Sequence, residues 1–225
     1  MPASPSRRAR ARRRPGRPPR SAAPADEVRA RLLRVAQQLF AERGYAAVSV
    51  RALARAAHVS PAMIAYYFRD KAGLLDAVVD EVLERLIAQL GELAAEAPTG
   101  GDAAERFIRL YVATLGREPW LPSFIVREVL AGDPARRARF AARFPARLAP
   151  LVLPVLAREV ASGRLRAGLD PALTLLSALG LCAFPFLAEP LLGPILGYRL
   201  DEGFPKRLAD HTARLFLDGV RGAAQ

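Results

Sequence analysis

The amino-acid sequence predicts an all-α protein in which a small N-terminal group of three helices precedes a larger helical domain. After residue 24, apolar side chains recur every three or four positions in almost every segment, which is the period of an amphipathic helix. No segment shows the convincing two-residue alternation of a half-buried strand. Serine, aspartate, proline and glycine stand where such helices would begin and end.

The length and composition fit one large domain, or a small domain joined to a larger one. The 225 residues are enough to bury a core, and the hydrophobic fraction of 52% excludes a disordered polyelectrolyte. Cys182 is the single cysteine, so it has no partner for a disulfide within the chain. A lone thiol fits a reducing compartment, and we expect the protein in the cytoplasm.

Positive charge is concentrated at the N-terminus. Residues 1–24 hold eight of the 34 Lys and Arg residues and no acidic residue, which leaves 26 basic against 22 acidic residues elsewhere. A basic tail beside a nearly neutral domain favours nucleic acid as the partner, with a solvated tail or a membrane-surface anchor as alternatives. Because the tail is rich in proline and arginine, we expect it to be extended and disordered, and it lacks the apolar run of a signal peptide.

The first helix is predicted to start at Ala25 or Asp26 and to end just before Gly44. Gly44 follows the last periodic turn, where glycine often adopts the left-handed conformation that ends a helix. One apolar face is formed by Val28, Leu32, Val35, Ala36, Leu39 and Phe40.

Two short helices are predicted next, over residues 49–57 and 60–67. Ser49 and Ser60 are good N-cap residues, and Pro61 occupies the first helical position of the second helix, which proline favours. Two residues separate these helices, and two short helices joined by a tight turn make a helix-turn-helix.

A long fourth helix is predicted from about Asp70 to about Glu96, where Pro98 and two glycines end it. The remaining helices are expected near 102–117, 122–131, 135–162, 171–188 and 205–220. The third of these contains Pro145, Pro150 and Pro154, which should kink or split it.

Residues 32–75 carry a more specific pattern. Its elements are 40–45 (FAERGY), 49–54 (SVRALA), 59–61 (VSP), 67–68 and 74–75, with Ile64 and Lys71. The segment resembles the N-terminal domain of the TetR family of bacterial regulators. The clear resemblance covers about a quarter of the chain, and beyond residue 95 it rests only on length and helical content.

The resemblance implies a regulator built in three parts. These are a disordered Arg/Pro-rich tail (1–24), a helix-turn-helix DNA-binding domain (25–72) and a helical ligand-binding and dimerisation domain (73–225), in which 73–96 form the connecting helix. We expect a cytoplasmic homodimer that binds a double-stranded DNA operator and represses transcription until a small apolar or aromatic effector releases it. The alternative is an architectural helix-turn-helix protein that senses no ligand.

The expected DNA contacts follow from this arrangement, since the second short helix should enter the major groove while the first crosses the backbone. Ser49 offers a hydroxyl and a helix N-terminus to phosphate, and Arg51 can reach phosphate or guanine. The lysine at position 71 resembles the family lysine that binds phosphate. Groove or backbone contacts are further expected from Ser60, Ala62, Met63, Ala65, Tyr66 and Tyr67. Ser49 and Ser60 could instead act only as caps, Tyr67 could be half in the core, and Lys71 could be a solvated helix start.

His58 departs from the family pattern, which often has glycine in this turn, but histidine tolerates a left-handed backbone better than most residues. Residues 14–19 (RPGRPP) partly resemble the AT-hook. Arg14 and Arg17 are therefore expected either to enter a narrow A·T minor groove or to attract phosphate without specificity.

The resemblance also places the effector and the dimer interface in the larger domain. Segments 171–188 and 205–220 should pair with their mates, because the first is apolar nearly all round and needs cover. Arg127 and Glu128 could form a buried ion pair, anchor a charged ligand or lie on the surface. Aromatic residues that could line a pocket, or simply fill the core, are Phe107, Tyr111, Trp120, Phe124, Phe140, Phe144 and Phe184.

Other classes of protein have little support in the sequence. With two histidines, one cysteine and no metal-ligand spacing, phosphate loop or nucleophile motif, we expect neither an enzyme nor a bound cofactor or metal. Residues 171–198 are apolar enough to raise a transmembrane interpretation, but three prolines and two glycines should break the stretch. We therefore expect no membrane partner, with a membrane-surface protein as the remaining alternative.

Overall fold

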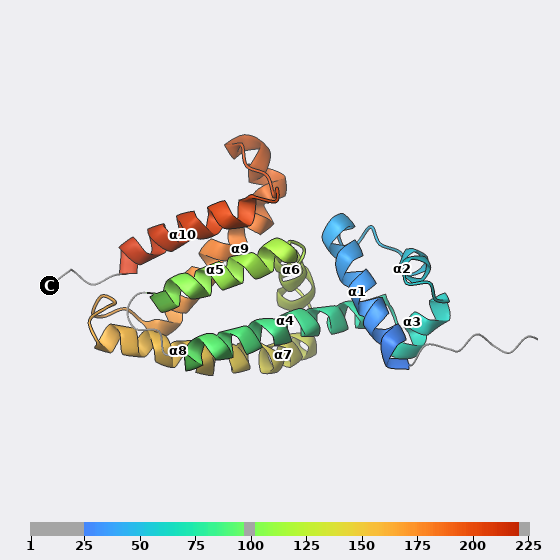
Figure 1. Ribbon diagram of the computed structural model, residues 1–225, viewed down its shortest axis with the longest axis horizontal. Helices are drawn as coiled ribbons and strands as arrows, with labels where there is room; N and C mark the ends of the chain where they lie inside the picture. The colour runs from blue at the N-terminus through green and yellow to red at the C-terminus, as the bar shows by residue number, and fades with distance from the viewer. Residues whose placement is uncertain (1–24, 97–101, 221–225) are drawn as a thin grey trace, which may run out of the picture.

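A computed structural model describes residues 25–96 and 102–220, and helices are the regular elements of these ranges. The Arg-rich tail, including Arg14 and Arg17, lies outside the described residues. A small N-terminal unit (α1–α3) forms one end of the molecule and a larger C-terminal domain (α5–α10) the other, with α4 running between them (Figure 1). The predicted all-α class is confirmed.

The N-terminal unit consists of α1 (Ala25–Arg43), α2 (Val50–Ala56) and α3 (Pro61–Phe68). The predicted apolar face of α1 packs on α2 and α4, and the side chains of Phe40, Leu53 and Ile64 are buried. The two predicted left-handed positions are present, since φ is +74° at Gly44 and +52° at His58. Arg69, after α3, also has a positive φ of +71°, which the sequence did not indicate.

The connecting helix α4 (Lys71–Ala95) is 25 residues long. It begins at Asp70, whose side chain accepts a hydrogen bond of 2.7 Å from the backbone N–H of Gly73. One apolar stripe runs along it, and α4 packs against α1 and α3 of the N-terminal unit and against α5 and α8 of the C-terminal domain. The two parts of the molecule therefore share α4 as a common core element.

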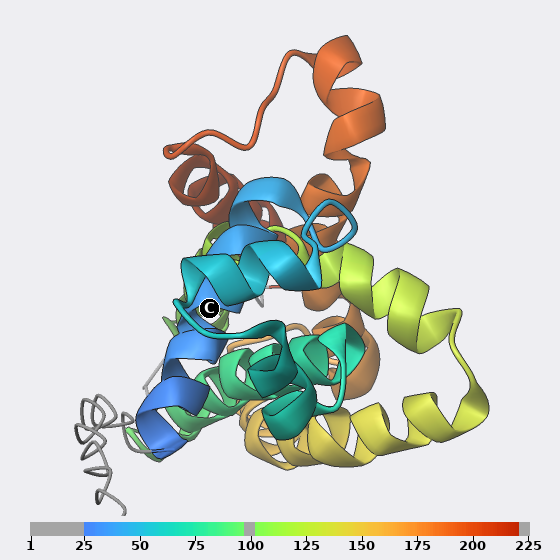
Figure 2. The ribbon, with the colours of Figure 1, turned by 90° about the vertical axis from the view of Figure 1, so that its right-hand side faces the viewer.

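The C-terminal domain is a stack of helices around α5 (Asp102–Arg117). Its further elements are α6 (Leu121–Phe124), the π-helical turn η1 (Ile125–Leu130), α7 (Pro134–Arg143), α8 (Pro145–Ala161), α9 (Pro171–Leu196) and α10 (Phe204–Val220). The helix α10 lies along α5, and α9 contacts α5, α8 and α10. Seen from the N-terminal unit, α7 and α8 lie on one side of the molecule and the far end of α9 on the opposite side (Figure 2).

Three of the predicted helix boundaries are corrected. The segment 122–131 is a short α-helix followed by a π-helical turn, and the segment 135–162 divides at Phe144, directly before Pro145. Pro150 and Pro154, however, lie inside α8, and the helix predicted over 171–188 continues to Leu196 despite three internal prolines.

These prolines are tolerated because of where they stand. Pro150 and Pro154 are four residues apart and exposed, so they share the solvent side of α8, and Pro190 and Pro194 have the same spacing and exposure in α9. The carbonyl groups that such prolines leave without an amide partner lie on the wet side of the helix, where water can satisfy them. Gly197, with φ +71°, ends α9.

By length and composition alone, α9 could cross a membrane, with a mean hydropathy of 1.8 over 18 residues. Together α7 and α8 are also long and apolar enough to cross a membrane, with a bend of 45° between them. This is weak evidence, because core helices of soluble proteins can be as long and apolar. Only 28% of the α9 window is buried within the chain, so most of this apolar helix lacks a covering partner.

Gly116 marks the closest approach of α5 and α10. A Cβ atom at this position would lie 2.4 Å from Cγ of Pro205, a ring atom that cannot rotate away. Gly91, in α4, has open space around the equivalent position. These two helical glycines therefore differ in the one property that decides whether a methyl group is tolerated.

We predict that Gly116→Ala lowers the free energy of unfolding by about 1–3 kcal/mol, because the added methyl group forces α10 away from α5. Gly91→Ala is the matched control and should raise stability by about 0.5–1 kcal/mol, the ordinary gain from replacing a helical glycine. Equilibrium urea denaturation measures both. A Gly116→Ala protein as stable as the Gly91→Ala protein would show that the two helices are not in this contact.

Candidate nucleic-acid interface

The two short helices start at serine residues that behave differently. Ser49 caps α2, since its Oγ accepts a hydrogen bond of 3.1 Å from the backbone N–H of Ala52. Ser60 stands at the N-cap position of α3, but its side chain makes no cap hydrogen bond, so the prediction that both serines cap is wrong for Ser60. The backbone N–H of Met63 instead bonds to the carbonyl oxygen of Ser60 at 3.0 Å. The exposed Ser60 hydroxyl is thus left without a helix amide to cap.

The outer side of α3 carries small side chains and one large aromatic ring. Ala62 and Ala65 are exposed, and 77% of Tyr66 is exposed to solvent. Tyr67 is half-buried as expected, and its ring lies 5.0 Å from that of Tyr66 in an edge-to-face arrangement. Met63, predicted to face the groove, is partly buried and packs against the core of the unit.

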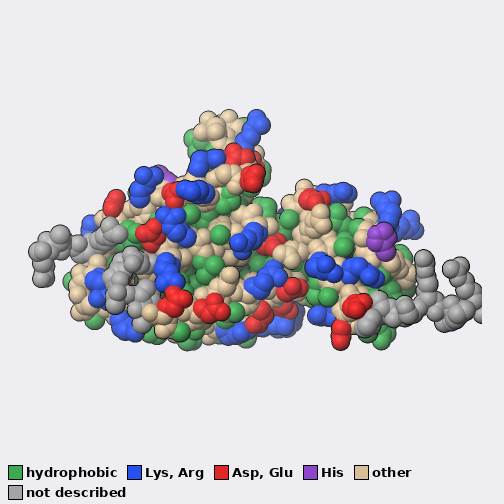
Figure 3. All heavy atoms as spheres, viewed as in Figure 1, with side chains coloured by type: hydrophobic (Ala, Val, Ile, Leu, Met, Phe, Trp, Pro, Cys, Tyr) green, Lys and Arg blue, Asp and Glu red, His purple; other side chains and the backbone are tan. Residues whose placement is uncertain are grey.

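The electrostatic character of this surface is positive. Residues 49–68 contain Arg51 and Arg55 and no acidic residue, and both arginines are exposed. Lys and Arg side chains are spread over the end of the molecule formed by α1–α3 (Figure 3). The fold thus gathers Ser49, Arg51, Ser60, Ala62 and Tyr66 on one short, exposed helix pair with a positive charge.

Lys71 is engaged within the protein. Its Nζ donates a hydrogen bond of 2.7 Å to the carbonyl oxygen of Tyr45 and lies 4.0 Å from the centre of the Tyr45 ring. Burial lowers the pKa of Lys71. The side chain ties the first residue of α4 to the segment after α1, which is a structural role that the sequence did not indicate. The phosphate contact expected of Lys71 stays a prediction.

Ion pairs hold α4 against α7 and α8. The carboxylates of Asp76, Asp80 and Glu84 recur every four residues and so share one face of α4. They bind, in order, Arg136 at 2.6 Å, Arg143 at 2.8 Å and Arg147. Burial raises the pKa of Asp80, and Arg143 lowers it. We call these three pairs the α4 ladder.

Of the three interpretations offered for Arg127 and Glu128, surface placement holds for Arg127, and a buried ion pair between the two residues is not formed. Arg127 is exposed on η1, and Glu128 bonds to Arg136 at 3.2 Å. Arg127 and Glu128 are neighbours in the π-helical turn, but the first faces solvent and the second faces Arg136. Arg136 therefore links Glu128 to Asp76 and joins η1 to α4.

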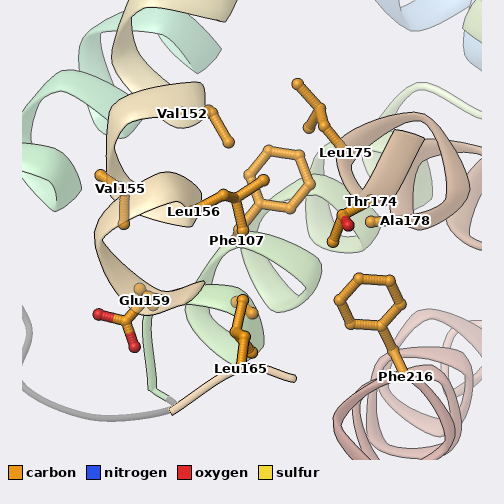
Figure 4. Close-up of a pocket in the computed structure, with 12 residues that line it drawn as sticks. Phe107, Val152, Val155, Leu156, Glu159, Leu165, Thr174, Leu175, Ala178 and Phe216 are labelled. Atoms are coloured by element: carbon orange, nitrogen blue, oxygen red, sulfur yellow. The ribbon is translucent and has the colours of Figure 1, made fainter. Parts of the chain in front are cut away.

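An apolar cavity lies between α5, α8, α9 and α10 (Figure 4). Its volume is about 40 Å³, and it opens into a looser space that is shared with solvent. Its polar lining comes from Thr174 and from Glu159, which is buried and receives two hydrogen bonds from Arg164, at 2.8 and 2.7 Å. The apolar lining includes Phe107, Val152, Leu156, Leu165, Leu175 and Phe216. The chemistry of this lining suits an apolar chain or ring, which would have to widen the cavity in order to enter.

The aromatic residues predicted to line one pocket are dispersed. Phe107 lines this cavity, and Tyr111 stacks on it with a ring distance of 5.9 Å. Phe124, Phe140 and Phe144 line a different hollow, between α4, η1 and α7, together with the α4 ladder. Trp120 is buried against Phe40 of α1, and Phe184 is 59% exposed on α9, so neither of these two residues lines this cavity. The residues missed, such as Leu156 and Phe216, have the helical spacing of ordinary core residues, so no sequence signal identified them.

Within residues 25–96 and 102–220, no group of three or more His, Cys, Asp or Glu side chains is placed to hold a metal ion. The exposed pair α2–α3, joined by a tight turn on a three-helix core, defines a helix-turn-helix protein.

Comparison with known proteins places this unit more narrowly. Residues 32–78 match the family model of the bacterial regulatory proteins of the tetR family. The chain is 32% identical over 102 residues to the probable HTH-type transcriptional regulator YttP of Bacillus subtilis (strain 168). That match covers 44% of the chain and 49% of YttP, so the chain spans about half the length of this relative.

Solved structures share the fold of most of the chain. A TetR/AcrR family transcriptional regulator from Thermobifida fusca YX-ER1 has a TM-score of 0.66 at 23% identity, covering 86% of this chain and 98% of its own. The transcriptional regulator FadR from Bacillus subtilis, solved with stearoyl-CoA, has a TM-score of 0.65 at 19% identity, covering 85% and 99%. Residues 32–78 thus form the N-terminal domain of the TetR family of bacterial regulatory proteins, a family of transcriptional regulators, and the predicted family is confirmed for this domain.

The contacts of Lys71 generate a prediction. Lys71→Met should lower the free energy of unfolding by about 1–3 kcal/mol, because it removes a charged hydrogen bond and a cation–π contact. Lys206→Met is the matched control: that side chain is 82% exposed in an ion pair within α10, and its loss should change stability by less than about 0.5 kcal/mol. Urea denaturation of both variants measures the difference. Equal stability of the two variants would mean that Lys71 does not stabilise the fold and is available to contact DNA.

Proposed function

We propose that the protein is a cytoplasmic, homodimeric repressor that binds its operator through α2 and α3 and releases it when an apolar effector binds. The observation that carries this proposal is the exposed, positively charged helix-turn-helix face, which has a tyrosine at its most exposed position. The family supports regulation of transcription. That it binds a specific operator, responds to an apolar effector and represses transcription is what we propose beyond the family.

The surface of α3 suits close approach to DNA. Ala62 and Ala65 have no side chain long enough to hold the helix away from the floor of the major groove, and their methyl groups can contact thymine methyl groups. Tyr66 extends beyond them with a hydroxyl for phosphate and a flat ring. Arg51 and the hydroxyl of Ser60 lie on the same helix pair and supply donors to the backbone or to guanine. Sequence is then read mainly through shape, apolar contact, Arg51 and the tyrosine.

We predict that Arg51→Ala and Tyr66→Ala each weaken operator binding by about 1–3 kcal/mol, which is about 5- to 150-fold in Kd. The probe is the intergenic DNA upstream of the protein's own gene, titrated by fluorescence anisotropy with unlabelled competitor and a salt series. Arg158→Ala is the control, because Arg158 is an exposed arginine on α8, outside the helix-turn-helix. It should bind like the parent protein.

Two results would count against this part of the proposal. Equal losses in Arg51→Ala and Arg158→Ala would show only that net charge matters. Weak binding that competitor DNA and salt abolish, with no preference for sequence, would favour the architectural alternative over an operator-specific regulator.

The apolar face of α9 supports a homodimer. Leu173, Leu176, Leu191 and Ile195 are each more than 60% exposed, and Leu215 of α10 is also exposed. A soluble monomer rarely leaves so large a group of apolar side chains in water. A second copy of the chain would cover them and would present two α3 helices to successive turns of DNA.

We predict that Leu176→Glu shifts the protein to a monomer in sedimentation velocity, because it buries a charge in the interface. Leu130→Glu is the matched control, since Leu130 is 62% exposed but lies on η1, away from α9 and α10. Its sedimentation should not change. A parent protein that sediments as a monomer, or one that enters anionic liposomes through α9, would contradict the dimer.

The cavity around Phe107 supports an apolar effector. Its lining is mostly aliphatic and aromatic, and FadR, which has the same fold, is solved with stearoyl-CoA. An effector that separates α8 from α5 would move α8, and through Arg147 and Glu84 it would bias the position of α4. The effect on DNA is then a shift between two populations of the dimer. Fatty acyl chains and aromatic ligands, tested for reversal of the anisotropy signal, are the first probes.

A further inference from the structure

Glu118 is a buried carboxylate at the junction of the two parts of the molecule. It lies directly after α5 and is 2% exposed. Its backbone is fixed on both sides, since its N–H donates to the carbonyl oxygen of Thr114 at 3.0 Å and its own carbonyl accepts from Leu121 N–H at 2.9 Å. The carboxylate therefore occupies a rigid position between the last turn of α5 and the first turn of α6.

The two oxygens of this carboxylate have partners from different parts of the fold. Oε1 accepts a hydrogen bond from the side-chain amide of Gln37, on α1 of the N-terminal unit. Oε2 accepts one of 2.9 Å from the indole N–H of Trp120, within the C-terminal domain. Burial raises the pKa of Glu118, while the two donors and the nearby Arg85 and Arg117 lower it. A buried carboxylate with this pair of donors is costly to leave half-satisfied.

Aromatic contacts continue the same junction. The ring of Trp120 lies 6.2 Å from that of Phe40, also on α1, and 6.1 Å from that of Phe124, both edge to face. Gln37 and Phe40 are three residues apart, so they share one face of α1 and meet Glu118 and Trp120 together. The N-terminal unit is thus attached to the C-terminal domain at α1 as well as through α4.

An attachment at a second point restricts motion that a single helix allows. A unit held by α4 alone can swing about the start of that helix, whereas a unit held also at α1 has a fixed angle. We propose that Glu118 is a positioning residue, which locks the angle of the helix-turn-helix unit on the C-terminal domain by holding Gln37 of α1 through one oxygen and Trp120 through the other. Its consequence for DNA rests on the proposed function, because a fixed angle sets the separation of two recognition helices in a dimer.

The test measures this angle directly and needs neither DNA nor effector. Spin labels at Arg55→Cys in α2 and Arg158→Cys in α8 report the distance between the two parts by pulsed electron resonance, with excess unlabelled chain to isolate distances within one chain. Both sites are exposed, whereas Cys182 is fully buried and its burial raises its pKa to about 12, so the label reacts at the introduced cysteines. The parent protein should give one narrow distance distribution.

Gln37→Leu removes one donor and keeps the approximate size of the side chain, and Trp120→Phe removes the other donor and keeps an aromatic ring of smaller size. Each should add a second, displaced distance and reduce the ratio of locked to unlocked molecules about tenfold, the effect expected for a hydrogen bond to a buried charge. Gln38→Leu is the matched control, since Gln38 is the next residue of α1 and its amide bonds to Glu42 on the exposed side at 2.8 Å. Its distribution should equal that of the parent.

Parent-like distances in both Gln37→Leu and Trp120→Phe would overturn the inference, and so would loss of folding in both, which would make Glu118 a general stability element. If Gln37→Leu alone fails to fold, Trp120→Phe decides, because it keeps an aromatic ring beside Phe40 and Phe124. If the variants show displaced distances but the parent protein binds no DNA, the role of Glu118 is supported and the proposed function is refuted. The inference about Glu118 and the proposed function can therefore fail separately.

Discussion

The apolar stripe of α4 has to be buried by both ends of the molecule at once. Leu74, Leu75 and Val78 belong to the core beneath α1 and α3, whereas Leu86 and Leu90 belong to the core of the C-terminal domain. Each such side chain contributes about 1.5–3 kcal/mol when buried, so neither end can release α4 without losing a large part of its own stability. Any change in the relative position of the two parts must therefore tilt α4 within its packing and cannot unfold it.

Polar contacts along α4 then decide which tilt is preferred. The α4 ladder fixes one side of the helix to α7 and α8, and Lys71 fixes its first turn to Tyr45. Most of these ion pairs are partly exposed, so each one is weak and responds to salt. Weak, repeated contacts are compatible with the change in the position of α4 that the proposed function requires, whereas the buried carboxylate of Glu118, after α5, holds Gln37 of α1.

The sequence carried enough information for the helices of the N-terminal unit, because each begins or ends at a residue with a local physical preference. Ser49, Pro61 and Gly44 act through one or two bonds to their own backbone, and such preferences do not depend on the rest of the fold. The candidate DNA-contact face followed from the same short helices. Met63 is the exception, since a long apolar chain on α3 can turn back onto the core.

The cavity and the Glu118 contact depend on segments that are far apart in the sequence, so neither could be predicted from local patterns. Phe107 and Phe216 line one cavity across more than 100 residues, and Gln37 meets Glu118 across 81. Their spacing within each helix is that of any core residue, so only the packing of α5 against α8, α9 and α10 distinguishes a cavity wall from a filled core. The apolar composition of α9 was visible in the sequence, but its exposed side was not. That side became evident only when the fold left Leu176 and Leu191 without a covering partner, which is what a second copy of the chain would supply.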